Sequence, residues 1–360
     1  MAKKDVLVYG AGMSGMVAAC NLAADGYRVI VREREPAFGG SPVFNPSTHT
    51  TPLDPVATSE YIGVDISPAF HAVSALSVYL HDLKIDAPAV ASYHVERSGR
   101  PESLDALLYQ KCLDAGVEFE FSTELKKDEI EKLPERTVIA CGLNPEAYEF
   151  VGMPFTPWYA WMATGGAEPE RDGYAWIWMD ECINEYGYAS FCNGINYNLL
   201  FSYGQEVPPE ALVKYRDWMR RCENMDDEEW EYVRGVCPVV TPDNPSLFRG
   251  PLVMCGTISG MIDPFMGFGI SGALISGKVA ATAVSDPEAG EREFERFNKN
   301  FARVLNWKRE VWYPLRERVD ILEDVVRILG PQRTLALLVD GLRHGRKNSA
   351  IPGFSPLSCH

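Results

Sequence analysis

Short apolar runs and one helical pattern alternate at the start of the chain. Val6, Leu7 and Val8 predict a strand, and the apolar segment 28–31 predicts a second one. The residues from Met16 to Ala24 between them predict a helix. Two parallel strands joined by a helix form a βαβ unit of roughly 30 residues or more. We therefore expect a βαβ unit at the N-terminus.

The pattern is less regular up to residue 150. Segment 41–68 is rich in Pro, Ser, Thr and Asp and predicts a long loop. A loop of this length inside a compact domain is usually functional. Ser103 can cap a helix that Gly116 ends. The remaining pattern predicts helices over 69–83 and 103–115, and strands over 117–121 and 137–140.

Aromatic residues dominate the pattern after residue 150. Tyr174, Trp176 and Trp178 alternate with smaller residues, so they share one face of a predicted strand. Asn193-Gly194 separates two apolar runs and predicts a hairpin with a type I′ turn. Segment 150–204 is therefore expected to form an antiparallel sheet with an aromatic face, and segment 207–234 to be mostly helical.

The C-terminal part returns to a strand followed by helices. Segment 252–254 predicts a strand, segment 271–284 a helix, and segment 291–345 helices interrupted at Pro314 and Pro331, followed by a tail. The expected class is α/β (α+β overall), with a parallel-sheet domain, an antiparallel-sheet domain and C-terminal helices. The expected boundaries are 1–150 with 240–290 for the discontinuous parallel-sheet domain, 151–239 for the antiparallel-sheet domain and 291–360 for the helical segment and tail.

Composition narrows the class of protein and its partners. The 360 residues are 46% hydrophobic and 23% charged, as in ordinary globular proteins. A formal charge of −16 argues against nucleic acid or anionic membrane as a partner. No apolar run is long enough to span a bilayer, and the N-terminus enters a strand directly, so we expect neither a transmembrane segment nor a signal peptide.

The cysteines indicate a reducing compartment. All nine are scattered and no C-x-x-C pair occurs. We expect reduced thiols in a cytoplasmic protein. The six histidines show no ligand spacing, so no metal site is predicted.

The turn after the first strand carries the clearest chemistry. Gly10, Gly12 and Gly15 spell G-x-G-x-x-G between strand and helix, and Glu33 ends the second strand. The glycines allow the tight turn, the approach of a pyrophosphate and close packing of helix on strand. The helix N-terminus favours phosphate, and Glu33 can accept hydrogen bonds from ribose hydroxyls. These features together predict FAD or NAD.

The segment from Gly267 to Gly272 also spells G-x-G-x-x-G. We do not interpret it as a second dinucleotide site, because Asp263-Pro264 precedes it directly and no acidic residue closes a second strand. One interpretation is that this loop and the helix it begins face the first cofactor. The other is close helix packing through Gly272, Ala273 and Gly277; both can hold.

Four segments together resemble FAD-dependent oxidoreductases of the glutathione-reductase-like superfamily, in the branch that holds p-hydroxybenzoate hydroxylase and geranylgeranyl reductase. These are the first turn with Glu33 and Gly39-Gly40, the segment 97–105, the strand 138–142, and the segment 256–269, which resembles G-D-A-A-G…D-P-x-x-G-x-G. The resemblance implies that the parallel-sheet domain is a Rossmann-like FAD-binding domain and the antiparallel-sheet domain a substrate domain. It also implies extended FAD with its pyrophosphate at the first turn. The sequence departs from the family at Thr257, where Asp is usual. Besides Gly10, Gly12, Gly15 and Glu33, the implied cofactor residues are Arg34, Gly39, Gly40, Arg100, Cys141, Gly142, Thr257, Asp263, Gly267, Gly269 and Ile270.

The aromatic strand suggests the reaction. Tyr174 to Met179 resembles the Y-x-W-x-F-P motif of geranylgeranyl reductases, which lines their substrate cavity. Tyr174, Trp176 and Trp178 are thus candidate substrate-binding residues, and Tyr174 is the first candidate proton donor, ahead of His49 and Cys192. The alternative interpretation is an ordinary core strand. The leading hypothesis is hydride transfer between flavin and a carbon–carbon double bond of a small hydrophobic or aromatic substrate.

Two further hypotheses stay open. One is an FAD-dependent monooxygenase, hydroxylase or halogenase, although the motif lacks the halogenase proline and no catalytic lysine is evident. The other is a non-redox escort-type binding protein on the same fold, which the uncharged Thr257 would suit. Electrons would come from NAD(P)H bound transiently or from a separate electron-transfer protein.

Overall fold

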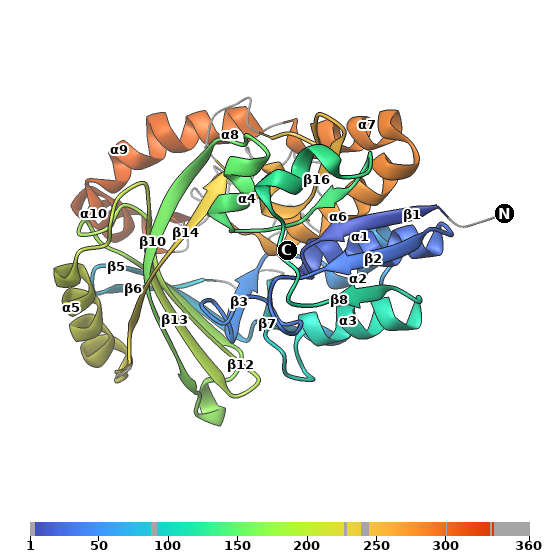
Figure 1. The fold of residues 1–360 in the computed structure, drawn as a ribbon. Helices are drawn as coiled ribbons and strands as arrows, with labels where there is room; N and C mark the ends of the chain where they lie inside the picture. Colours follow the sequence, from blue (N-terminus) through green and yellow to red (C-terminus); the bar gives the residue numbers. More distant parts are fainter. Residues whose placement is uncertain are drawn as a thin grey trace.

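A six-stranded sheet organises one half of the molecule, on the right in Figure 1. The computed structural model describes residues 4–87, 92–226, 229–238, 245–299, 301–331 and 333–334. The strand order is β15-β16-β9-β1-β2-β8, and all neighbouring pairs except β15–β16 are parallel. The strands are β1 (Asp5–Tyr9), β2 (Arg28–Arg32), β8 (Glu118–Glu120), β9 (Val138–Ile139), β15 (Phe248–Arg249) and β16 (Leu252–Met254).

Helix α1 (Met13–Ala24) confirms the βαβ unit and begins three residues earlier than the pattern predicted. Every residue from Met13 to Leu22 is buried, because α1 packs against both α6 (Ile270–Ser285) and α3 (Leu104–Asp114). Ser103 caps α3 as expected by accepting from the Ala106 N–H at 3.1 Å. The remaining helices on this side are α2 (Pro55–Ile62), α4 (Pro145–Phe150) and α7 (Pro287–Asn298).

A seven-stranded sheet forms the second half, in the order β14-β10-β13-β12-β11-β5-β6. All pairs are antiparallel except β11–β5. The Asn193-Gly194 hairpin is confirmed, with φ of 55° and 71° at the two turn residues, as a type I′ turn requires. The strands are β5 (Ala75–Leu80), β6 (Leu83–Ala87), β10 (Phe155–Gly166), β11 (Tyr174–Met179), β12 (Tyr186–Cys192), β13 (Ile195–Tyr203) and β14 (Glu231–Pro238).

Helices cover both faces of this second sheet (Figure 1). Helix α5 (Pro209–Trp218), continued by the π-helix η4 (Met219–Glu223), packs on one face. The C-terminal helices pack on the other face through residues such as Trp312 and Leu322. They are α8 (Phe301–Trp307), the π-helix η6 (Lys308–Trp312), α9 (Tyr313–Arg316) and α10 (Val319–Leu329). The part of the predicted helical segment beyond residue 334 and the predicted tail lie outside the described residues.

Three predicted elements differ from the structure. The helix expected over 69–83 is instead β4 (Phe70–Ala72), β5 and the start of β6, because Leu76, Val78 and Leu80 alternate and β5 finds β11 as a partner. The helical segment expected over 207–234 ends at Glu223, where Asn224 adopts φ 50°, and β14 follows. The loop expected over 41–68 contains a strand and α2, whose cap is Asp54.

A small sheet joins the two halves. Its order is β3-β7-β4, with β3 (Ser47–Thr51) antiparallel to β7 (Tyr93–Arg97). The Thr48 hydroxyl donates to the Ser190 carbonyl at 2.9 Å, which ties β3 to β12. The small sheet therefore holds its residues between the parallel sheet and the antiparallel sheet.

Candidate flavin and substrate cavity

One cavity of about 530 Å³ extends from the turn after β1 to the antiparallel sheet. Gly10 and Gly12 line it, whereas Gly15 does not. A Cβ on Gly15 would lie 2.0 Å from the Gly10 carbonyl oxygen, so this glycine serves packing of α1 on the turn. A Cβ on Gly12 would meet nothing within 4 Å, so its open side is free for a ligand. In the first turn, Gly12 thus leaves space for a ligand and Gly15 lets the helix pack on the turn, as the fingerprint predicts.

The acidic residue at the end of β2 is fixed beside this turn. Glu33 accepts from the Ala11 N–H at 2.7 Å and from the Glu35 N–H at 3.0 Å. It lines the cavity together with Arg34, Cys141 and Gly142. Burial raises the pKa of the Cys141 thiol to about 12, so this thiol stays protonated and uncharged. This end of the cavity offers a carboxylate and backbone groups, which suit an adenosine ribose.

Besides Gly15, the predicted cofactor residues Gly39, Arg100 and Asp263 do not line the cavity, and for the first two a neighbouring residue does. Arg100 donates to the Asn193 carbonyl oxygen at 3.2 Å, near the surface. Arg97 lines the cavity instead, held by two hydrogen bonds of 2.7 and 2.8 Å to the buried Asp105 carboxylate. Gly40 lines the cavity, whereas Gly39 packs against Gly99. Arg97 belongs to β7, whose strand character the sequence pattern did not reveal.

The late glycine-rich loop, residues 256–269, also contains both residues that line the cavity and residues that shape the loop. Thr257, Gly267, Gly269 and Ile270 line the cavity as expected. Asp263 does not; its carboxylate accepts from the Met266 N–H at 2.9 Å and so shapes the loop. The loop therefore faces the same cavity as the first turn, and no strand runs into it to make a second dinucleotide fold in the described residues.

An aromatic chamber forms the far end of the cavity. Residues at alternate positions of β12 and β13 point to one face, because Tyr186 pairs with Phe201 and Tyr188 with Leu199 in register. The chamber is lined by Phe44, Trp158, Ile177, Tyr186, Tyr188, Tyr197, Leu199, Phe201 and Tyr203. Sequence analysis missed the tyrosines, although the Asn-Gly turn and their period of two carried the signal.

The predicted aromatic wall of β11 faces the other way. Trp176 and Trp178 are buried against Trp218 of α5, and Tyr174 donates to the Glu223 carboxylate at 2.8 Å. None of the three β11 aromatic residues lines the cavity; Ile177, between the tryptophans, does. This corrects their expected placement as substrate residues, and it removes Tyr174 as a proton donor at this site. The alternative interpretation, a core strand, describes these side chains.

The other two candidate catalytic residues differ in position. Cys192 is buried at the end of β12 and does not line the cavity. His49 of β3 does line it, with its Nε2 2.9 Å from the Ser47 hydroxyl and its ring centroid 5.7 Å from that of Tyr197. Burial, together with the charge of Arg97, lowers the pKa of His49 to about 3. His49 is therefore a neutral hydrogen-bonding group in this cavity rather than a charged acid.

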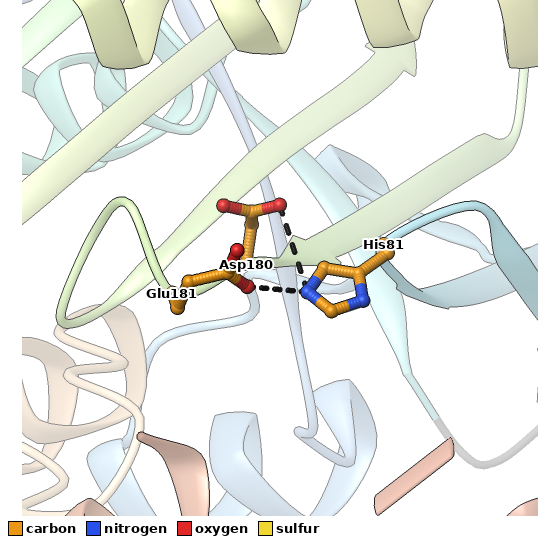
Figure 2. A group of neighbouring side chains, drawn as sticks. All are labelled: His81, Asp180 and Glu181. Atoms are coloured by element: carbon orange, nitrogen blue, oxygen red, sulfur yellow. Dashed lines mark hydrogen bonds and ion pairs between the residues drawn. The ribbon is translucent and has the colours of Figure 1, made fainter. Parts of the chain in front are cut away.

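His81, Asp180 and Glu181 form a charged cluster at the ends of β5 and β11 (Figure 2). None of the three lines the cavity. His81 contacts the carboxylates of Glu181 and, at 3.0 Å, Glu323 of α10, with Asp180 3.8 Å away. Lys214 of α5 lies 2.7 Å from Asp180. We assign no metal to this cluster, because Lys214 already supplies a positive charge to its carboxylates. The cluster joins α5 and α10 to the sheet.

His81 should stabilise the fold through this cluster only while its ring is charged. Burial alone would lower the pKa of His81, but the neighbouring carboxylates outweigh it and raise that pKa above the usual 6.5. Its stabilisation is thus complete below about pH 6.5 and is lost as the pH rises through the folded-state pKa. We expect His81→Gln to lower the free energy of unfolding by roughly 0.5–1 kcal/mol at low pH, after allowing for solvent screening, and by less at high pH.

Urea unfolding of both proteins between about pH 5.5 and 9 measures this difference. Arg318→Gln serves as the control, since its exposed ion pair with Asp320 contains no group that titrates in this range. A destabilisation by His81→Gln that grows toward high pH would contradict the assignment.

Comparison with known proteins supports the cofactor. Residues 5–91 match the family described as the FAD binding domain. No match was found among curated proteins. The match and the first-turn geometry together confirm FAD as the expected cofactor and a Rossmann-like FAD-binding fold.

Solved structures share the whole architecture at low sequence identity. The flavin-dependent brominase Bmp2 is 13% identical with a TM-score of 0.62, over 96% of this chain and 100% of that one. The Diels-Alderase PyrE3 of pyrroindomycin biosynthesis is 15% identical with a TM-score of 0.61, over 98% and 81%. A point mutant of 2-methyl-3-hydroxypyridine-5-carboxylic acid oxygenase is 15% identical with a TM-score of 0.58, over 88% and 94%. In the described residues, no helix has the length and apolar character that a membrane span requires.

Proposed function

We propose that this protein is an FAD-dependent oxidoreductase of the monooxygenase type, acting on a flat apolar or phenolic substrate. The observation that carries the proposal is the single cavity that connects the first turn with the aromatic chamber. When bound, FAD supplies the redox chemistry, and the protein supplies binding, orientation and exclusion of water. The similar folds of an oxygenase and a brominase support oxygen chemistry over double-bond reduction.

The residues of the chamber suit a flat substrate. Trp158 and Phe201 are among the lining residues, and aromatic side chains in such a pocket exclude water from the reacting atoms. Burial raises the pKa of Tyr188 to about 12, and it raises the pKa of Tyr197 as well. These phenols are therefore neutral hydrogen-bonding groups at neutral pH. The Tyr188 hydroxyl already bonds the Thr50 N–H and hydroxyl, so a phenolic or polar aromatic group on the substrate would match Tyr197.

A halogenase is less well supported than a hydroxylase. The described residues that line the cavity include arginines but no lysine. Reduction of a carbon–carbon double bond stays the second candidate. It is favoured by Tyr197 and Tyr203, whose hydroxyls could supply the proton that such a reaction needs. The reductant for either reaction would be transient NAD(P)H or a separate protein.

The test is reoxidation of the reduced holoprotein. The protein is reconstituted with FAD, reduced anaerobically and mixed with candidate substrates with and without oxygen. We expect substrate-dependent oxygen uptake and a product that carries an added oxygen atom, detected by mass spectrometry. Substrate-dependent reoxidation without oxygen would instead establish the reductase. A protein that does not bind FAD would contradict both and favour the non-redox binding protein.

A further inference from the structure

An ion pair is almost fully buried beneath the aromatic chamber. Lys308, the first residue of η6, is 4% exposed, and Glu185, just before β12, is 3% exposed. The Lys308 ammonium lies 3.0 Å from a Glu185 carboxylate oxygen. Desolvating two charges costs about as much as their attraction returns, so such a pair contributes little to stability by itself. Its placement therefore calls for another explanation.

Both charges contact aromatic rings. The Tyr313 hydroxyl donates to Glu185 at 2.6 Å. The Lys308 ammonium lies 5.4 Å from the centroid of the Tyr203 ring and 5.3 Å from that of Tyr313. At such distances, a desolvated ammonium attracts a ring face. Lys308 thus links the C-terminal helices to the last residue of β13.

Tyr203 carries this link to the cavity. Its side chain lines the cavity, as does Gly267 of the late glycine-rich loop. A Cβ on Gly267 would lie 2.4 Å from the Tyr203 hydroxyl oxygen, so hydroxyl and loop are in direct contact. In the part of the chain that the structure describes, this hydroxyl has no hydrogen-bond partner. The Tyr203 ring is therefore held by the Lys308 ammonium, while its hydroxyl is available at the loop.

We propose that Lys308 is a positioning residue for the cavity. The Lys308–Glu185 pair fixes the Tyr203 ring, so that the Tyr203 hydroxyl donates a hydrogen bond to a substrate bound beside Gly267. This inference rests on the proposed function, since it assumes a flat phenolic or aromatic ligand in the chamber. A purely structural pair that only joins the C-terminal helices to the sheet is the competing explanation.

The test uses variants that remove the charges but keep the volume. Lys308→Met/Glu185→Gln removes both charges and leaves an amide oxygen for Tyr313 to contact. Tyr203→Phe removes the hydroxyl alone. Arg318→Met/Asp320→Asn is the matched control, because that ion pair is 3.1 Å long and exposed. The probe is 2-naphthol, a flat phenol, titrated into the oxidised FAD-loaded protein and followed by the change in flavin absorbance.

We expect the charge-free variant and Tyr203→Phe each to bind 2-naphthol about 5- to 10-fold more weakly, the loss of one hydrogen bond. Their combination should lose no more than either alone, since both act on one group. FAD content and the midpoint of thermal unfolding should stay near those of the wild type, as they should in the control pair. A structural pair would instead leave naphthol affinity unchanged.

Wild-type affinity in either the charge-free variant or Tyr203→Phe overturns the proposal. If the charge-free variant does not retain FAD, Lys308→Gln replaces it, since it keeps a hydrogen-bond donor beside Glu185 but removes the cation from the Tyr203 ring. Unchanged naphthol affinity in Lys308→Gln then overturns the proposal. No binding of 2-naphthol by the wild type overturns both the substrate class and this role. Because binding needs no turnover, absence of oxygen uptake contradicts only the proposed reaction.

Discussion

Replacing Gly12 with alanine should leave the fold intact and remove most of the FAD affinity. Gly12 caps α1 with φ −77° and ψ 176°, a conformation that alanine adopts without strain. A Cβ there meets no protein atom within 4 Å, yet Gly12 lines the cavity. The methyl group would occupy the space through which the pyrophosphate approaches the backbone. We expect the dissociation constant for FAD to rise on the order of 100-fold.

Titration of the apoprotein with FAD, followed by flavin fluorescence, measures this change. Gly165→Ala is the matched control, since a Cβ at Gly165 also meets nothing within 4 Å and this residue lies away from the cavity. Both apoproteins should unfold at the wild-type urea concentration. Wild-type FAD affinity in Gly12→Ala would show that the pyrophosphate does not lie at the first turn.

Replacing Gly272 with alanine should destabilise the fold itself. A Cβ on Gly272 would lie 1.9 Å from the Met261 carbonyl oxygen and 2.8 Å from its carbonyl carbon. Both are backbone atoms and cannot turn aside as the end of a side chain can. Helix α6 would have to move away from the late glycine-rich loop. We expect the free energy of unfolding to fall by about 3 kcal/mol, the upper part of the range for overpacking.

The control lies three residues earlier in the same string of glycines. A Cβ on Gly269 meets nothing within 4 Å, and Gly269 lines the cavity. Gly269→Ala should therefore keep the stability of the apoprotein and weaken FAD binding. Urea unfolding of both apoproteins compares them. Equal stability of Gly272→Ala and wild type would refute the packing role of this residue.

The two glycine-rich strings show how far sequence reasoning reaches. In the late string, Gly267 and Gly269 line the cavity while Gly272 packs against Met261, so the packing role is confirmed and the cofactor role stays a prediction. The motif alone does not distinguish one glycine of a string from another. It cannot say which of them faces a ligand, since that depends on segments that are distant along the chain.

Short-range signals in the sequence were enough for several local elements. The βαβ unit, the capped helix α3 and the Asn193-Gly194 turn follow from periodicity, capping and positive φ, which act over a few residues. The acidic end of β2 and the first turn likewise sufficed for the expectation of FAD or NAD, and the resemblance of four segments to a known family narrowed it to FAD. These features needed no knowledge of what packs against them.

Which face of the antiparallel sheet meets the cavity depends on tertiary packing alone. Period two gives a strand two faces, and on β11 both are apolar, with Trp176 on one and Ile177 on the other. A layer of helices packs on each face, and α5 packs on the face that carries the tryptophans. The choice rests on contacts between residues far apart in the chain, such as Trp178 with Trp218 and Tyr203 with Lys308. No local pattern encodes such contacts, so only the tertiary structure shows where the aromatic chamber lies.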